Sequence, residues 1–429
     1  MAEEAENMVK SSPELATERP PETGDPDAGI RWTVAHAAAG SPWWRSHFER
    51  AHVDPKSISG VADLPRLPFT TKEDLRASYP LGWAAVPESS LVRLHASSGT
   101  TGKRTVCAYT AQDLADWREQ FARSFVTAGV TSADRVQVMV GYGLWTAGAG
   151  FQAGAERVGA LVIPTGPGNL DLQVEMLLDL GTTVICSTSS FALLLAETIE
   201  ARGLTGSLAL RVGVFGSERW GTRMRERIES LLGLESFDIY GLTELYGPGV
   251  GIECTEHEGI HYWSDYFVME VVDPLSGECL PPGEEGEVVV TTLRKEGMPL
   301  IRYRTRDLSR LISEPCKCGS PFPRLARLTG RTDDMVKVKG VAIFPSQVET
   351  LLGRVEGVGS EYQLHFYRNG ERGDALVVRV EAEDYPGLKD SLVYQLHEGL
   401  SVRPEVELLP LGSLPRTERK TQRVFEHRG

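Results

Sequence analysis

The chain has 429 residues, too many for one compact core, and therefore predicts two or more domains. Its formal net charge of −14 argues against a nucleic-acid-binding protein, because phosphate recognition needs a strongly basic surface. No run approaches the roughly 20 consecutive apolar residues that a membrane-spanning helix requires. The first residues lack the order of a secretion signal, and six cysteines in so long a chain do not form a disulfide framework. We expect a cytoplasmic protein.

Residues 1–28 are rich in Glu, Pro, Ser and Thr, a composition typical of a disordered acidic tail. Helical segments are expected from 30 to 87, one of them opening at Thr71, whose hydroxyl can cap a first turn that carries acidic residues. A tight turn follows over 97–103.

A strand over 105–109 and a helix over 111–128 come next. Continuous apolar runs then alternate with helical patterns, which predicts a parallel sheet covered by helices on both faces. These runs cover residues 136–140, 160–164, 182–187 and 211–217.

Short β-type runs separated by Pro- and Gly-rich turns occupy residues 268–312 and predict antiparallel pairing. Beyond Thr332 the pattern is that of a small α+β unit. We therefore predict an α/β fold with a large N-terminal domain over 29–331, which combines parallel sheets with an antiparallel β subdomain. A small mobile C-terminal domain over 332–429 follows it.

The run His95–Lys103 combines two glycines, several hydroxyls and a lysine. Gly99 and Gly102 let the backbone bend so that N–H groups converge on phosphate oxygens, and Lys103 adds a cation. It is not a Walker A loop, because only two residues separate the glycines and Arg104 follows the lysine. The run predicts a phosphate-binding loop; a polar surface turn is the alternative.

The run 237–244 places an aromatic ring, a glycine, a hydroxyl and a carboxylate at the end of an apolar strand. Tyr240 could stack on a base, Thr243 could bind a phosphate and Glu244 could hold Mg²⁺ through oxygen ligation. The alternative is an ordinary exit from strand to loop.

The run Tyr303–Asp307 and the later Arg331 form a third candidate group. A carboxylate such as Asp307 can accept both ribose hydroxyls, and a guanidinium can reach ribose or phosphate. A solvated edge strand is the alternative.

In this order the three motifs resemble the acyl-adenylate-forming superfamily of acyl-CoA synthetases, adenylation domains and luciferases. Within it the chain is most similar to the phenylacetate–CoA ligase family. The likeness rests on LPFTTKEDLRASYPLG, SSGTTGK, GYGLWTAGAG, YGLTELYGPGV, PLIRYRTRDL and GRTDDMVKVKGVAIFP, and it extends from about Leu64 to the C-terminus.

The resemblance implies a role for each matching residue. Gly216, Ser217 and Glu218 would line the adenine, with Tyr240 on its other face. The phosphate loop would consist of Ser97, Ser98, Gly99, Thr100, Thr101, Gly102 and Lys103.

By the same resemblance, Thr243 and Glu244 would serve the phosphates and Mg²⁺. Asp307 would bind ribose with help from Arg331, and Asp333 would be the hinge about which the small domain rotates.

The segment Leu414–Lys420 is similar to the mobile segment that carries the adenylation lysine of the superfamily. Lys420 would neutralise charge between the acid and the α-phosphate of ATP, because attack of a carboxylate on phosphorus brings anions together. Rotation of the small domain would then admit a thiol to the mixed anhydride.

By the same resemblance, the run GYGLWTAGAGFQAGAE should line the acid pocket. A small Ala153 would leave room for a larger or substituted ring, and Gln152 could bind a ring substituent. The candidate lining residues are Tyr142, Trp145, Phe151, Gln152, Ala153, Gly241 and Gly247. Core packing is the alternative for the three aromatic ones.

Two departures from the family concern the second half-reaction: Ala342 replaces an Asn, and Arg419 replaces a Gly before the lysine.

Three hypotheses on the function remain open. The first is an aryl-CoA ligase, which relatives suggest is a dimer. The second is an aryl-acid adenylating enzyme that serves a carrier protein, an amine or another small nucleophile. The third is a non-catalytic nucleotide-binding protein.

Three cysteines and a histidine could make a closed tetrahedral zinc site. The CxCG turn resembles a pattern in part of the family; free thiols are the alternative. The candidate ligands are Cys254, His261, Cys316 and Cys318, whereas structural roles are expected for Cys107, Cys186 and Cys279.

Overall fold

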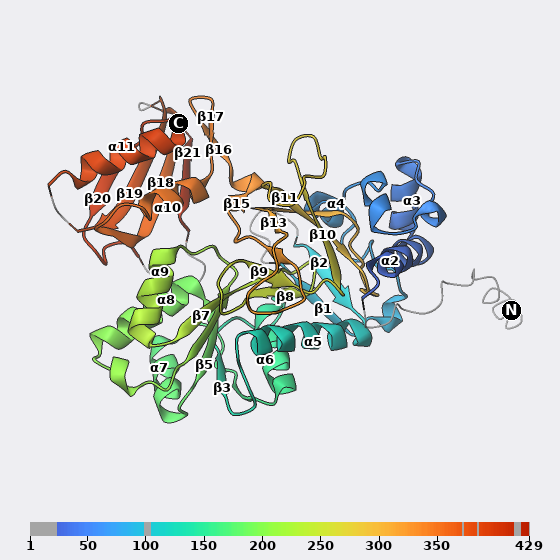
Figure 1. Cartoon of the computed structure of the whole chain (residues 1–429), viewed down its shortest axis with the longest axis horizontal. Coiled ribbons are helices and arrows are strands. Elements are labelled where there is room, and N and C mark those ends of the chain that lie inside the picture. The colour runs from blue at the N-terminus through green and yellow to red at the C-terminus, as the bar shows by residue number, and fades with distance from the viewer. Residues whose placement is uncertain (1–23, 98–103, 371–372, 384–385, 416–421, 429) are drawn as a thin grey trace, which may run out of the picture.

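The protein consists of a large N-terminal domain and a smaller C-terminal domain (Figure 1). The structure is a computed structural model and describes residues 24–97, 104–370, 373–383, 386–415 and 422–428. Within these ranges no helix combines the length and the apolar character needed to cross a lipid bilayer.

Three helices, α2 (Pro26–Gly40), α3 (Pro42–Arg50) and α4 (Lys72–Ala77), open the described chain. The side chain of Asp25 caps α2 by accepting a hydrogen bond from the amide of Asp27, and Pro26 stands at the first helical position. The predicted disordered tail over 1–28 is therefore too long, because α2 begins at Pro26. The expected cap at Thr71 is confirmed as a capping box.

A nine-stranded sheet forms the centre of the large domain, in the order β13-β14-β9-β8-β7-β6-β5-β3-β4. The run from β7 to β4 is parallel, as the apolar runs predict, and the strands beyond β7 are antiparallel. The strands are β3 (Arg135–Val138), β4 (Leu161–Ile163), β5 (Val184–Thr188), β6 (Val212–Gly216), β7 (Glu235–Leu242), β8 (Gly247–Glu253), β9 (Ile260–Tyr262), β13 (Leu311–Ile312) and β14 (Arg324–Leu325).

Helices cover both faces of this sheet because its buried strands are apolar on both sides. Val184 of β5 packs into the core with α5 and α6, whereas the next residue, Ile185, packs into the core with α7, α8 and α9. The helices are α5 (Ala111–Thr127), α6 (Ala147–Val158), α7 (Leu170–Asp179), α8 (Ser189–Ala201) and α9 (Thr222–Leu232).

The predicted antiparallel subdomain is a four-stranded sheet in the order β10-β11-β12-β15. A separate hairpin, β1-β2, flanks the predicted phosphate loop. These strands are β10 (Phe267–Val272), β11 (Gly286–Thr292), β12 (Tyr303–Ser309), β15 (Gly330–Arg331), β1 (Arg93–Ala96) and β2 (Val106–Tyr109).

The small domain has its own apolar core, built from residues after 335. A two-stranded sheet, β16-β17, and a four-stranded sheet, β20-β19-β18-β21, pack against two helices, as the α+β pattern predicts. The elements are β16 (Val336–Val338), β17 (Val341–Ile343), α10 (Pro345–Leu352), β18 (Val358–Gly370), β19 (Gly373–Ala382), α11 (Leu388–Leu400), β20 (Glu405–Leu409) and β21 (Val424–Arg428).

Candidate active site

Side chains from the phosphate-loop motif and the YGLTE motif meet at the carboxyl end of β7. The Thr105 hydroxyl lies 2.6 Å from the Ser97 hydroxyl and 3.2 Å from Oε1 of Glu244. The ammonium of Lys72, at the start of α4, lies 3.3 Å from the same carboxylate oxygen. Glu244 is thus a buried carboxylate in contact with a cation. Residues 98–103, which include Lys103, lie outside the described part of the chain.

The YGLTE motif also meets the third motif, across the gap between two sheets. The Tyr240 hydroxyl donates to Oδ2 of Asp307 at 2.9 Å, and Arg331 donates to Oδ1 at 2.8 Å. Arg331 also holds Asp333 through two hydrogen bonds of 2.8 and 2.9 Å. Burial raises the pKa of the Asp307 carboxyl, and Arg331 and Tyr240 partly offset this effect. Each carboxylate oxygen keeps a lone pair for a further donor.

The predicted adenine segment lies beside Tyr240, because Gly216 at the end of β6 pairs with Ile239 of β7. Ser217 has a φ of 71° and turns the chain sharply after the strand. The Glu218 carboxylate accepts a hydrogen bond of 2.6 Å from the amide of Ser190 in the first turn of α8. Glu218 is therefore engaged by a helix N-terminus, where its charge is favourable.

The two glycines expected in the acid pocket mark a close backbone approach. A Cβ atom on Gly241 would lie 1.8 Å from the carbonyl oxygen of Gly247, and one on Gly247 would lie 2.6 Å from the hydroxyl of Thr146. Since Thr146 directly precedes α6, this contact joins the YGLTE loop to the predicted acid-binding segment.

The candidate residues of that segment fall into two groups. Phe151 is a core residue, 2% exposed, with edge-on contacts to Phe121 and Phe125 at ring distances of 5.4 and 6.0 Å. This corresponds to the core-packing alternative. Tyr142, Trp145, Gln152 and Ala153 are partly exposed. The Gln152 amide donates to Glu156 at 2.8 Å, and burial raises the pKa of Tyr142 to about 12.

A buried lysine that the sequence analysis missed lies beneath Glu244. The ammonium of Lys295 donates to the carbonyl oxygens of Glu244 and Leu245 at 2.8 and 2.5 Å. It lies 4.8 and 5.0 Å from the ring centres of Tyr109 and Tyr246. The sequence signal was a lysine three residues after an apolar strand that ends at Thr292, although a charged residue at such a position usually faces solvent.

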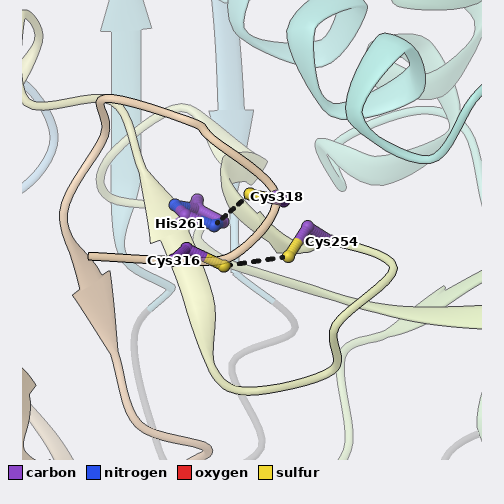
Figure 2. Close-up of side chains that lie close together, drawn as sticks. All are labelled: Cys254, His261, Cys316 and Cys318. Atoms are coloured by element: carbon purple, nitrogen blue, oxygen red, sulfur yellow. Dashed lines mark hydrogen bonds between the residues drawn. The ribbon is translucent and has the colours of Figure 1, made fainter. Parts of the chain in front are cut away.

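The four candidate zinc ligands converge on one point, although they come from two separate stretches of chain (Figure 2). Their ligand atoms all lie within 4.8 Å of one another. Cys254 and Cys316 have their sulfurs 3.6 Å apart, and Cys318 Sγ lies 3.4 Å from Nε2 of His261. Zn–S bonds of about 2.3 Å in a tetrahedron imply S···S distances of about 3.8 Å.

The tautomer of His261 also suits a metal. Its Nδ1 lies 2.8 Å from the Phe322 carbonyl, which only accepts, so Nδ1 carries the proton and Nε2 has a free lone pair. Burial raises the pKa of the Cys254 thiol to about 12. A thiolate there at neutral pH needs a neighbouring cation.

Models of two known families match the chain, the AMP-binding enzyme family over residues 41–293 and the AMP-binding enzyme C-terminal domain over 340–428. The phenylacetate–coenzyme A ligase of Pseudomonas putida is 41% identical, with 93% of this chain and 92% of the relative covered. That of Escherichia coli K12 is 42% identical, with 93% of each covered. The chain belongs to the phenylacetate–coenzyme A ligase family. Its members are AMP-forming acid–CoA ligases.

The fold of this family member matches solved structures of 2-hydroxyisobutyryl-CoA ligase at 28% identity, over 93% of this chain and 88% of the other. The TM-score is 0.84 for the post-adenylation state of that enzyme in complex with 2-HIB-AMP. It is 0.68 for the complex with 2-HIB-AMP and CoA in the thioesterification state. The described residues are thus more similar overall to the post-adenylation structure of that enzyme than to its thioesterification structure.

Proposed function

We propose that the protein activates an aromatic carboxylic acid with ATP, releases pyrophosphate and transfers the acyl group from the acyl-adenylate to coenzyme A. The observation that carries this proposal is the meeting of the three motifs at the end of β7: Thr105 contacts Glu244, and Tyr240 contacts Asp307. Family membership supports the same reaction. A non-catalytic protein would have no need to keep these contacts.

The described residues fit the parts of ATP in turn. Asp307 would accept the ribose hydroxyls, and the Tyr240 ring would lie against the adenine beside Gly216. Thr243 would bind phosphate. A Mg²⁺ ion held by the Glu244 carboxylate would supply positive charge to the phosphates. Glu244 suits such an ion because its carboxylate is buried and lies in contact with one cation, the ammonium of Lys72.

Tyr142, Gln152 and Ala153 would meet the ring of the acid, and the Gly241–Gly247 contact would shape the pocket floor. A partly exposed amide at Gln152 favours an aromatic acid with a polar ring substituent. Transfer to a carrier protein or an amine is the second candidate for the last step, because Ala342 and Arg419 depart from the family there.

The test is pyrophosphate release from substituted benzoic, phenylacetic and cinnamic acids, with and without CoA. We expect one aromatic class to support release and CoA to be converted into its thioester. Acid-dependent release without thioester formation would favour another acceptor. No acid-dependent release with any member would refute the ligase assignment.

We also propose that Cys254, His261, Cys316 and Cys318 hold a structural zinc ion. The donor set is closed and offers no position for a substrate, and the ion would tie the loop before β9 to the loop before β14. The support is the convergence of the four ligand atoms and the proton of His261 on its outward nitrogen.

Zinc binding predicts about one metal ion per chain in purified protein, by elemental analysis. Cys316→Ser should lose the metal and lower the unfolding temperature, because binding free energy of a structural zinc adds to folding. Cys279→Ser is the matched control, since Cys279 contacts Glu270 and lies outside the cluster. A stable, metal-free wild type would refute the assignment.

A further inference from the structure

One arginine of the large domain binds three main-chain carbonyls of the small domain. Arg223, in the first turn of α9, donates through Nε to the carbonyl of Gly353 at 3.1 Å. Its two terminal nitrogens donate to the carbonyls of Val355 and Val358. The planar guanidinium suits such a three-point contact because its N–H donors are spread over three nitrogens, whereas the donors of a lysine share one nitrogen.

A second arginine, in the loop that precedes α9, adds side-chain contacts to the junction. Arg219 lies 3.4 Å from the Glu349 carboxylate and 3.5 Å from the Thr350 hydroxyl, both on α10. Figure 1 shows α10 next to the α9 side of the large domain.

The chemistry of this junction suits a contact that forms and breaks. The carbonyl of Gly353 closes α10 and lies at the negative end of its dipole, which attracts a cation. Among the described residues, the apolar core of the small domain is built from residues after 335, so the two domains share no apolar core there. Polar interfaces of this kind permit relative motion of domains.

The junction belongs to one orientation of the small domain. The described arrangement matches the post-adenylation state of the relative better than its thioesterification state. A rotation of the small domain would carry Gly353, Val355 and Val358 away from Arg223 together, because all three carbonyls lie on the short segment from the end of α10 to the first residue of β18.

We infer that Arg223 is a positioning residue that holds the small domain in the adenylation orientation and is released before the acyl transfer. The inference rests on the proposed function, since it assigns the contact to the first of two half-reactions. Arg223 touches no reacting atom; it acts by fixing where the small domain, and with it the segment that carries Lys420, is placed.

The test separates the two half-reactions in Arg223→Ala. Acid-dependent exchange of pyrophosphate into ATP should fall about tenfold, whereas thioester formation from supplied acyl-AMP and CoA should stay the same or rise. Small-angle scattering of the nucleotide-free variant should change, because more molecules leave the described orientation. Arg223→Lys should lie between wild type and Arg223→Ala.

Arg227→Ala is the matched control, because Arg227 lies one turn further along α9 and pairs with Glu200 of the same domain at 2.5 Å. Equal loss of both half-reactions in Arg223→Ala, or rates and scattering equal to those of the control, would overturn the inference. If the wild type itself showed no acid-dependent exchange, the proposed function would fail instead; altered scattering in Arg223→Ala would still identify the contact as an orientation lock.

Discussion

Asp307 has both carboxylate oxygens engaged, one by Tyr240 and one by Arg331, which fixes the carboxylate where ribose hydroxyls would meet it. Asp307→Asn keeps the shape but replaces a charged acceptor with an amide. A hydrogen bond to a charged group contributes about 1.5–3 kcal/mol, so we expect the KM for ATP to rise about 10- to 100-fold. Titration of ATP at saturating acid measures this. An unchanged KM would remove Asp307 from the ribose site.

The ammonium of Lys295 donates hydrogen bonds to the main chain at Glu244 and Leu245. In Lys295→Met the carbonyls of Glu244 and Leu245 lose their donor, at about 1–3 kcal/mol each. The interior also loses a charge whose burial costs several kcal/mol, so the two effects largely cancel. We expect little change in unfolding free energy but a several-fold rise in the KM for MgATP.

Chemical denaturation and ATP titration at several Mg²⁺ concentrations check both parts. Lys56→Met, at an exposed lysine of the N-terminal region, is the control. If Lys295→Met had the KM for MgATP of the wild type, Lys295 would contribute to packing alone.

The candidate site residues that can be singled out from sequence are those whose chemistry is local in the chain. Tyr240, Thr243 and Glu244 share one short motif, and Asp307 ends another. Lys295 could not be predicted in this way, because its role depends on carbonyls about 50 positions earlier in the chain. Arg223 was missed for the same reason: its partners are main-chain atoms, which leave no pattern in side-chain types.

Helix α6 packs so closely on α5 that glycines are required at the contact. A Cβ atom on Gly150 would lie 2.3 Å from Cζ of Phe121, and one on Gly154 would lie 2.5 Å from its Cβ. Overpacking of a core costs about 1–3 kcal/mol. We therefore expect Gly150→Ala to lower the unfolding free energy by about this amount, measured by chemical denaturation.

A second substitution tests the geometry of that contact. Phe121→Leu removes the ring end that a Cβ on Gly150 would meet, so Gly150→Ala should cost less in this background. Gly154→Ala should not be rescued, because its Cβ would also lie 2.8 Å from the Phe121 carbonyl carbon, which the substitution keeps. Equal rescue of both variants would contradict the described packing of α5 on α6.

At the scale of elements, the apolar runs predicted β3, β5 and β6 because each is continuous and buried on both faces. Strand β8 was not expected, since its sequence, GPGVGIE, is rich in glycine, and glycine is depleted in strands. The glycines are needed for close approach: a Cβ on Gly249 would lie 2.5 Å from Phe121, and one on Gly251 would lie 2.4 Å from the His261 carbonyl.

At the scale of the whole molecule, sequence predicts two domains but not how they are placed. Each domain has its own hydrophobic periodicity, which gives each its own core. Their relative orientation depends on a few polar contacts, such as those of Arg219 and Arg223. An arginine that contacts another domain cannot be told in sequence from one that faces solvent. This division of contacts would permit the alternation between orientations that the proposed two-step reaction needs.

Lys420 and Arg223 should then act through the same orientation. Lys420 lies outside the described residues, between Pro415 and β21 of the small domain. Lys420→Ala should lower adenylate formation about 100-fold or more, because an aligned cation is lost from the site. It should spare thioester formation from supplied acyl-AMP. Equal loss of both steps would contradict the role of Lys420.

The double variant decides whether the two residues are linked. Once Lys420 is absent, the orientation of the small domain no longer contributes to adenylation. Arg223→Ala should therefore have almost no further effect in the Lys420→Ala background, although it lowers the rate about tenfold in the wild type. The same tenfold loss in both backgrounds would place the effect of Arg223 within the large domain. If Arg223→Ala instead has no further effect once Lys420 is absent, Arg223 sets how often Lys420 reaches the reacting carboxylate.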